Sequence, residues 1–196
     1  MGRKRSIDRN ALLDAAEAVV RRDGAARVTL NAVAAEAGVS KSTVLYNCKN
    51  KEALLLALIE RRIAAEENTA NEIRAALDAA PDSGIRTRIA LARREMSEDD
   101  RAVILSLSAT IAQNNELAAP IRAHYARVLD EILQTSTTSD DAFIAFLAIE
   151  GLHCLERFEI LQLDPDRRRR TLDDITRLAR RGLTRSESEG GARCAV

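Results

Sequence analysis

The spacing of apolar residues is the feature that most constrains the fold of this chain. Apolar side chains recur at intervals of three and four positions through almost the whole sequence, which is the period of an amphipathic α-helix. Residues that interrupt helices are rare, because only 8 glycines and 3 prolines occur among 196 residues. The pattern predicts an all-α fold of about nine helices.

Local start and stop signals divide the chain into these helices. Gly24 is expected to end the first helix, and Pro81 to end the long fourth one. Thr29, Ser40 and Asn50 are expected to cap the second, third and fourth helices. The predicted helices are about 8–23, 30–37, 41–48, 51–80, 84–95, 100–113, 115–134, 140–163 and 166–183.

Charge is distributed unevenly, although the formal net charge is zero. Residues 1–51 carry ten Lys and Arg against five Asp and Glu, an excess of +5 that the rest of the chain balances. The stretch 37–51 contains no carboxylate, but it holds three lysines, one tyrosine and several small hydroxyl and amide side chains. This composition suits contact with a polyanion such as DNA. Chance clustering of solvated arginines is the alternative explanation for the basic N-terminal part.

The predicted helices 30–37 and 41–48 have the dimensions of a helix-turn-helix. In that motif the second helix enters the DNA major groove with its N-terminal residues toward the base edges. Gly38 suits the left-handed turn residue, while Ala34 and Val39 fit two helices that cross at a steep angle.

The second of these helices should have a buried and an exposed side. We expect Val44 and Leu45 to point inward. The small polar residues at its start then remain for solvent or for a ligand.

The sequence around this motif resembles the tetracycline-repressor (TetR) family of bacterial transcription regulators. The match runs without a gap through LLDAA at 12–16, Gly24 and Thr29 to VAAEAGVSKSTVLYNCKNKEALL at 33–55. Most members of the family place a tyrosine at the position of Leu45 and a phenylalanine at the position of Cys48, so this chain departs from the pattern there.

The resemblance implies a domain organisation and a function. Residues 6–52 would be the DNA-binding domain, 53–185 a helical domain for effector binding and dimerisation, and 186–196 a flexible tail. The protein would be a ligand-responsive transcriptional regulator, most often a repressor in this family, released from its operator by a small molecule.

The resemblance also implies which residues face DNA. These are Thr29, Ser40, Lys41, Ser42, Thr43, Tyr46, Asn47 and Lys51. Physical chemistry supports the set independently, because a helix N-terminus offers free amide donors and a partial positive charge to phosphates. A solvated helix face is the alternative for each residue.

An effector cavity in the C-terminal domain follows from the same resemblance. The candidates by composition are Met96, Leu105, Thr110, Tyr125, Phe143, Phe146 and His153, each of which could equally be ordinary core. An aromatic content of 3% argues against a pocket of stacked rings and favours a smaller or aliphatic effector.

Dimerisation is expected from the segment 141–163, which is apolar on nearly all sides and must be covered. In the TetR family the last two long helices pack against those of a second subunit. Here 140–163 and 166–183 are placed to do so. A homodimer would read a palindromic operator with two recognition helices.

Nothing in the sequence indicates an enzyme or a metal site. Glu150 and His153 match the Glu-x-x-His pattern of di-metal carboxylate bundles, but Ile121 stands where His124 would need a glutamate for the second copy. The three cysteines are widely spaced and odd in number. We therefore predict no catalytic residue, metal or cofactor. A small helical enzyme and an effector-independent DNA-binding or protein-interaction module are the alternatives.

A membrane location is not expected. The longest uninterrupted apolar run, 53–59, is far too short to cross a bilayer, and the basic N-terminus is followed by no apolar signal core. We expect a soluble, cytoplasmic protein.

Overall fold

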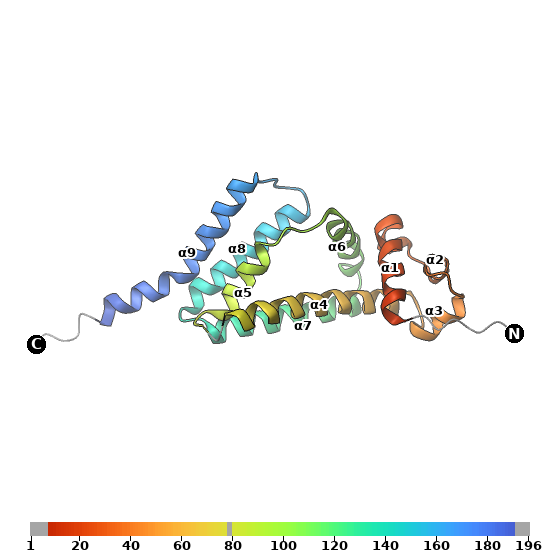
Figure 1. Cartoon of the computed structure of the whole chain (residues 1–196), viewed down its shortest axis with the longest axis horizontal. Helices are drawn as coiled ribbons and strands as arrows, with labels where there is room; N and C mark the ends of the chain where they lie inside the picture. Colours follow the sequence, from red (N-terminus) through yellow and green to blue (C-terminus); the bar gives the residue numbers. More distant parts are fainter. Residues whose placement is uncertain (1–7, 78–79, 191–196) are drawn as a thin grey trace, which may run out of the picture. The chain divides into compact units, whose positions relative to one another are not determined.

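The computed structural model describes residues 8–77 and 80–190, which are helical apart from their connections (Figure 1). In this part of the chain there are nine α-helices and no strands. The elements are α1 (Arg9–Asp23), the 3₁₀ turn η1 (Ala25–Arg27), α2 (Leu30–Glu36), α3 (Lys41–Asn47), α4 (Lys51–Ala76), α5 (Ser83–Ala92), α6 (Glu98–Ile111), α7 (Asn115–Thr135), α8 (Ser139–Arg157) and α9 (Pro165–Gly190). The predicted all-α fold is confirmed.

The chain divides into two compact units. The first unit contains the residues up to Ala65 together with Met96–Ala123. The second contains Glu66–Glu95 and the residues from His124 onward. Helices α4 and α7 therefore each contribute to both units, whereas α1, α2 and α3 belong wholly to the first.

The core of the first unit is built from the inner faces of α1 to α4, together with residues of α6 and of the start of α7. Leu12, Val33 and Leu58 are fully buried in it, and Val44 of α3 is buried as predicted. The prediction for Leu45 was wrong, because this side chain is 40% exposed. Cys48, four residues after Val44 and hence on the same helical face, is the second buried residue of this segment.

The core of the second unit joins α5, α7, α8 and α9. Ile85, Ile132, Ile149 and Leu172, one from each helix, are fully buried. Gly84 allows α5 to approach α7 closely, because a Cβ atom there would lie 2.9 Å from the Cα of Ile132. Any larger residue at this position would therefore push the two helices apart.

A buried aspartate ties the start of α5 to the end of α7. Asp82 is 3% exposed, and its Oδ1 accepts hydrogen bonds from the backbone N–H of Thr137 at 2.8 Å and from its hydroxyl at 3.0 Å. The backbone N–H of Asp82 donates to the carbonyl of Thr135 at 3.0 Å. The carboxylate thus has two donors, as a buried acid requires.

The predicted end of the helix 140–163 was wrong, because α8 ends at Arg157. Glu159 adopts a left-handed φ of 55°, and the N–H of Ile160 donates to the carbonyl of Leu155 at 2.9 Å. This is the hydrogen bond of a Schellman helix ending, which usually has a glycine at the left-handed position.

Two other helix ends differ from the prediction by four residues or more. Helix α4 ends at Ala76 rather than Ala80, and residues 78–79 lie outside the described part. Helix α9 continues to Gly190, past the predicted end at 183 and into the predicted tail; residues 191–196 of that tail are not described.

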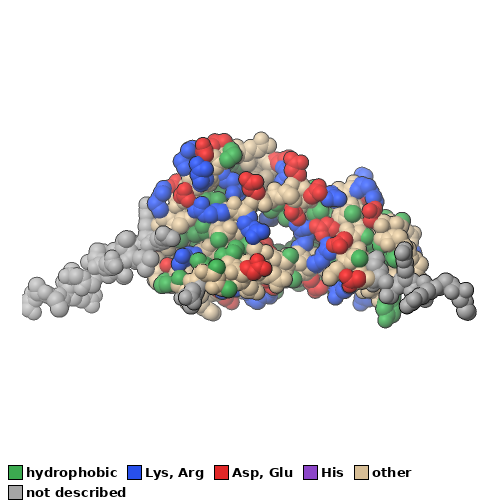
Figure 2. All heavy atoms as spheres, in the orientation of Figure 1, with side chains coloured by type: hydrophobic (Ala, Val, Ile, Leu, Met, Phe, Trp, Pro, Cys, Tyr) green, Lys and Arg blue, Asp and Glu red, His purple; other side chains and the backbone are tan. Residues whose placement is uncertain are grey.

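The visible surface carries both signs of charge. Figure 2 shows Lys and Arg side chains interspersed with Asp and Glu, with apolar side chains between them. None of the described helices combines the length and the apolar character needed to cross a membrane.

Candidate nucleic-acid interface

The turn between α2 and α3 has the predicted backbone. Gly38 has a left-handed φ of 63°, and the N–H of Val39 donates to the carbonyl of Ala34 at 2.9 Å. An L-residue with a side chain would be strained at this φ, so glycine is needed for the sharp reversal. The turn sets the direction in which α3 leaves α2.

Three hydroxyl groups form a hydrogen-bonded array at the start of α3. Ser40 is the N-cap, and its Oγ accepts from the backbone N–H of Thr43 at 3.2 Å. The same oxygen lies 2.7 Å from the Oγ of Ser42 and 2.9 Å from the Oγ1 of Thr43. The cap confirms the predicted helix start and holds these side chains together on the open side of the helix.

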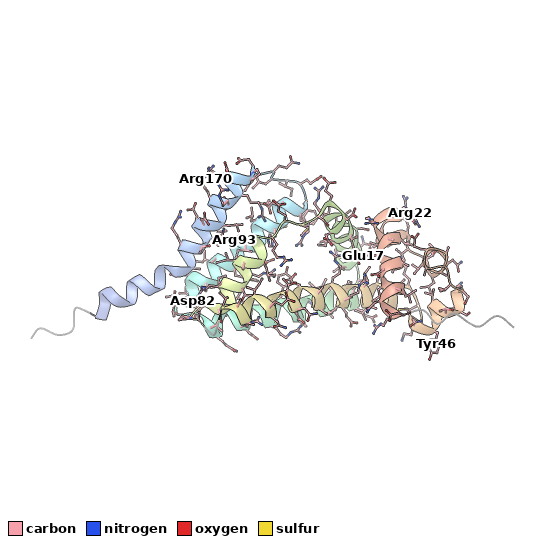
Figure 3. The ribbon with its side chains drawn as sticks, in the orientation of Figure 1. Glu17, Arg22, Tyr46, Asp82, Arg93 and Arg170 are labelled. Carbon is pink, nitrogen blue, oxygen red and sulfur yellow. The ribbon has the colours of Figure 1, made fainter. Side chains whose placement is uncertain are left out.

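Helix α3 has one anchored face and one open face. Val44 and Cys48 are buried against the first core, whereas Lys41 and Ser42 are exposed. Tyr46 is 91% exposed and extends away from the helices around it in Figure 3. A large aromatic side chain left this open contributes little to the folded core and is accessible to a binding partner.

The remaining predicted DNA contacts have partners within the protein. Asn47 donates from Nδ2 to the carbonyl of Thr43 at 2.9 Å. Thr29 caps α2 by accepting from the N–H of Ala32 at 3.1 Å. Lys51 donates from Nζ to the carbonyl of Ala26 at 2.6 Å and so joins the start of α4 to η1. Their contact with DNA stays a prediction.

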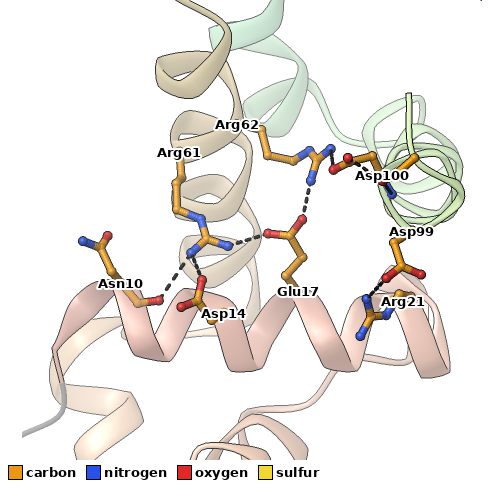
Figure 4. Close-up of polar contacts among 9 residues, drawn as sticks. Asn10, Asp14, Glu17, Arg21, Arg61, Arg62, Asp99 and Asp100 are labelled. Carbon is orange, nitrogen blue, oxygen red and sulfur yellow. Dashed lines mark hydrogen bonds and ion pairs between the residues drawn. The ribbon is translucent and has the colours of Figure 1, made fainter. Parts of the chain in front are cut away.

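Ion pairs fix α1 against α4 and α6 within the first unit (Figure 4). Glu17 of α1 accepts from both Arg61 and Arg62 of α4, and these three side chains are only 23–26% exposed. Partial shielding from water makes such pairs stronger than fully exposed ones. Further pairs of the network are Arg61 with Asp14, Arg62 with Asp100 and Arg21 with Asp99.

A hydrogen bond adds to this attachment. The backbone N–H of Ala25 donates to the Oγ of Ser106 in α6 at 2.6 Å. The helix-turn-helix is thus mounted on α4 and α6 through α1 and η1.

The predicted effector residues lie in both units. Met96, Leu105 and Thr110 belong to the first; Met96 is 47% exposed. In the second unit, the ring centroids of Tyr125 and Phe146 lie 6.4 Å apart.

The other two candidates in the second unit differ in environment. Phe143 is 39% exposed. His153 is partly buried, and burial lowers its pKa below the usual value.

Sequence reasoning missed a charged cavity of about 290 Å³ in the second unit. It lies among α4, α5 and α7, and none of the predicted effector residues lines it. The lining residues are Glu66, Glu67, Ala70, Asn71, Arg74, Gly84, Thr87, Arg88, Leu91, His124, Arg127, Val128 and Glu131.

The sequence did contain a signal for this cavity. Arg88 interrupts the apolar stripe of Ile85 and Ile89 on α5, and His124 follows Leu117 and Ile121 on the apolar stripe of α7. Polar residues at such buried positions need partners.

Arg88 is the most deeply buried charge of this cluster, at 5% exposure. Its Nε donates to Glu150 at 2.8 Å, its Nη1 forms an ion pair with Glu66, and its guanidinium lies 5.6 Å from the ring centroid of Tyr125. Tyr125 in turn donates to Glu150 at 3.0 Å, and burial, then the Glu150 charge, raises its pKa to about 12.

His124 lies between two carboxylates of α4. Its Nε2 is 3.4 Å from Glu66 and its Nδ1 is 3.1 Å from Glu67. The hydrogen bond to Glu66 raises the pKa of His124 above its usual value, against the effect of burial. Burial would raise the pKa of Glu66, but its contacts with His124 and Arg88 outweigh burial and lower the pKa to about 2.

An all-α protein with an anchored, outward-facing helix-turn-helix belongs to the class of DNA-binding transcription regulators. Family comparison identifies the family. Residues 12–58 match the "Bacterial regulatory proteins, tetR family" domain, and residues 73–180 match the "Tetracyclin repressor-like, C-terminal domain". The chain therefore belongs to the TetR family of transcriptional regulators, as the sequence resemblance predicted.

Solved structures share the fold at low sequence identity. A transcriptional regulator from Streptomyces coelicolor A3(2) is 22% identical with a TM-score of 0.69, over 87% of this chain and 97% of that one. The multidrug binding protein EbrR in complex with malachite green is 21% identical with a TM-score of 0.67, over 87% and 96%.

A third structure is a transcriptional regulator from Saccharomonospora viridis in complex with choline. It is 20% identical with a TM-score of 0.66, over 85% of this chain and 93% of that one. The comparison with curated protein sequences returned no match. At these identities the structural likeness establishes the fold alone.

The cap of α3 can be tested with two serines that lie two residues apart. Ser40→Ala removes the acceptor for the Thr43 N–H and should lower the free energy of unfolding by about 1 kcal/mol. Ser42→Ala is the matched control, because its hydroxyl contacts only the Ser40 side chain, and the loss should stay within about 0.5 kcal/mol. Urea unfolding followed by circular dichroism measures both. Equal losses in the two variants would contradict the assigned cap.

Proposed function

We propose that this protein is a ligand-responsive repressor that binds a palindromic operator as a homodimer and is released by a small-molecule effector. The observation that carries the proposal is the open face of α3, where Tyr46 is 91% exposed beside the hydroxyl array while Val44 and Cys48 hold the opposite face in the core. Family membership supports the same function.

The chemistry of α3 suits contact with duplex DNA. Lys41 can reach a guanine edge or a phosphate, and the methyl group of Thr43 can meet a thymine methyl. No carboxylate lies between Ala37 and Lys51 to repel phosphates. Thr29 and Lys51, at the starts of α2 and α4, are placed to contact the backbone on either side.

An apolar face on α8 supports the homodimer. Phe143, Ile144, Leu147, Leu155 and Phe158 are 37–52% exposed and recur at a helical period. A Cβ atom added at Gly151, on the same face, would meet nothing within 4 Å, which leaves room for a second backbone to approach.

A second copy of the chain is the partner that this face fits. Contiguous exposed apolar surface usually marks an interface, and a two-fold dimer places the same patch on both subunits. The proposed interface comprises α8 and the adjacent α9, which packs against it. Two recognition helices about 34 Å apart would then read successive major grooves of a palindrome.

Helix α4 connects effector binding to DNA binding in this proposal. It carries Glu66, Glu67 and Arg74 at the cavity, and it carries Arg61 and Arg62 in the ion pairs to α1. An effector that shifts α4 would change the position of the helix-turn-helix. The ligands named for EbrR and for the Saccharomonospora viridis regulator support a small-molecule site in this fold. Effector and operator must then weaken each other's binding reciprocally.

DNA binding is tested by fluorescence anisotropy with the DNA upstream of the protein's own gene, at two salt concentrations. Lys41→Ala combined with Tyr46→Ala should abolish sequence-specific binding, because each lost base contact weakens it roughly tenfold or more. Lys41→Ala alone should also flatten the salt dependence if it contacts phosphate.

Arg94→Ala is the control for this experiment, because it removes an exposed positive charge of the second unit that lies outside α8 and α9. Its affinity for DNA should equal that of the wild type. Unchanged affinity of the double variant would show that α3 does not read DNA, and a wild type with no sequence preference at any concentration would reject the proposed function.

The dimer is tested by sedimentation equilibrium. Leu147→Glu places a charge at the centre of the exposed face of α8 and should raise the dimer dissociation constant at least tenfold, because burying an unpaired carboxylate is unfavourable. Leu133→Glu is the matched control, since Leu133 is an exposed apolar residue of α7. A monomeric wild type, or a Leu147→Glu variant that associates as tightly as wild type, would contradict the proposed interface.

A further inference from the structure

We propose that the cavity of the second unit binds a small organic monocation, which neutralises the same excess negative charge that a proton on His124 neutralises in the empty site. The inference rests on the proposed function in one respect, that this cation would be the effector. It assigns the chemical class of the ligand and a dependence of its affinity on pH.

The lining of the cavity holds three carboxylates and three guanidinium groups, but the ion-pair network to which they belong does not balance. Arg74 pairs with Glu131, and Arg127 pairs with Glu67 at 2.7 Å. Arg88 is shared by two carboxylates, Glu66 and Glu150. Glu150 does not line the cavity, but it pairs with Arg88, which does. Counted with Glu150, the network holds four carboxylates against three guanidinium groups: Glu66, Glu67, Glu131 and Glu150 with Arg74, Arg88 and Arg127. The network therefore carries one negative charge that no guanidinium group compensates.

His124 can carry the compensating charge in the absence of a ligand. The ring is 5% exposed, and both of its nitrogens face carboxylate oxygens, of Glu66 and Glu67. A neutral imidazole has one N–H and can donate to only one of them, whereas the imidazolium ion donates to both.

The other charged and titratable groups around His124 belong to the same network. They are Glu66 and Glu67 on α4, Arg88 on α5, Tyr125 and Arg127 on α7, and Glu150 on α8. The hydrogen bond to Glu66 raises the pKa of His124, which agrees with a protonated ring in the ligand-free protein.

A second, independent feature indicates a ligand in the cavity. Thr87 lines it and is 3% exposed, yet its Oγ1 has no hydrogen-bond partner in the protein. Buried hydroxyl groups almost always have a partner. A bound molecule with a hydroxyl or amino group would supply one.

The lining selects a small and largely aliphatic ligand. A volume of about 290 Å³ lies at the lower end of the range for small-molecule pockets. Ala70, Leu91 and Val128 offer apolar contacts for methyl or methylene groups, and the lining residues include no Phe, Tyr or Trp ring to stack on a flat dye. No group of three or more metal-ligating side chains occurs in the part of the chain that the structure describes, so the residues favour an organic cation over a metal ion.

The exchange of a proton for a cation fixes the sign of the pH dependence. Below the raised pKa of His124 the proton occupies the site, and a cation binds only if the proton leaves. Affinity should therefore increase with pH, by up to tenfold per pH unit below that pKa, and level off above it. A neutral or anionic ligand would show no such increase.

Isothermal titration calorimetry of the full chain tests whether the cavity binds cations and whether their affinity rises with pH. The ligands are choline, tetramethylammonium and butylammonium, with 3,3-dimethylbutan-1-ol as the uncharged analogue of choline. At least one cation should bind more tightly at pH 8 than at pH 6, and the uncharged alcohol should bind at least tenfold more weakly than choline. Titrations in two buffers of different ionisation enthalpy should show release of close to one proton per cation at the lower pH.

Three variants separate the residues' contributions. Glu67→Gln removes the excess charge and should weaken cation binding at least tenfold. His124→Gln should retain binding but lose the proton release and the pH dependence. Thr87→Val should weaken binding of choline, which has a hydroxyl group, more than binding of tetramethylammonium, which has none. Thermal melting of each variant confirms that it is folded.

The inference is overturned if none of the three cations binds below about 10 mM, if the alcohol binds as tightly as choline, or if wild-type binding does not change with pH. Its failure differs from failure of the proposed function. Specific operator binding by a protein that ignores these cations would refute the cation site alone. A wild type without operator binding would refute the proposed function, while the calorimetry would still decide the cation site.

Discussion

The left-handed backbone at Gly38 is the constraint on which the rest of the N-terminal part depends. Because Gly38 turns the chain sharply, α3 leaves α2 with Val44 and Cys48 facing the core and with Lys41, Ser42 and Tyr46 facing outward. Helix α3 has only seven residues and would not be stable alone. Burial of one of its faces in the core stabilises it. The opposite face is thereby free for a ligand, and we propose from membership of the TetR family that this ligand is DNA.

Charge has a different role in each unit. In the first, Glu17 is shared by Arg61 and Arg62 and joins α1 to α4, so the helix-turn-helix follows the position of α4. In the second, the ion-pair network at the cavity, counted with Glu150, holds one more carboxylate than guanidinium groups, and Arg88 and His124 each lie between two acids. Buried or half-buried charges of this kind are costly unless they are paired. Their presence at a cavity agrees with a binding site better than with a purely structural one.

Local signals in the sequence predicted the fold and much of the candidate interface. The caps at Thr29, Ser40 and Asn50 and the turn at Gly38 depend only on neighbouring residues, and all four are present. The end of α8 could not be predicted in this way, because Glu159 takes a left-handed conformation without a glycine. Nor could the cavity, because its ion pairs join residues of α4, α5, α7 and α8 that are brought together only by tertiary packing. Leu45 was assigned to the wrong face because a short helix with two adjacent apolar residues does not reveal which of them is buried.

The central claim is that two copies of α3 face one side of a duplex together. Hydroxyl-radical footprinting of the wild-type protein on the DNA upstream of its own gene tests it most directly. The account predicts symmetric protection of both strands in two patches whose centres lie about one helical turn, roughly 10 base pairs, apart. A single patch, or protection that spreads along the DNA without a two-fold pattern, would contradict it.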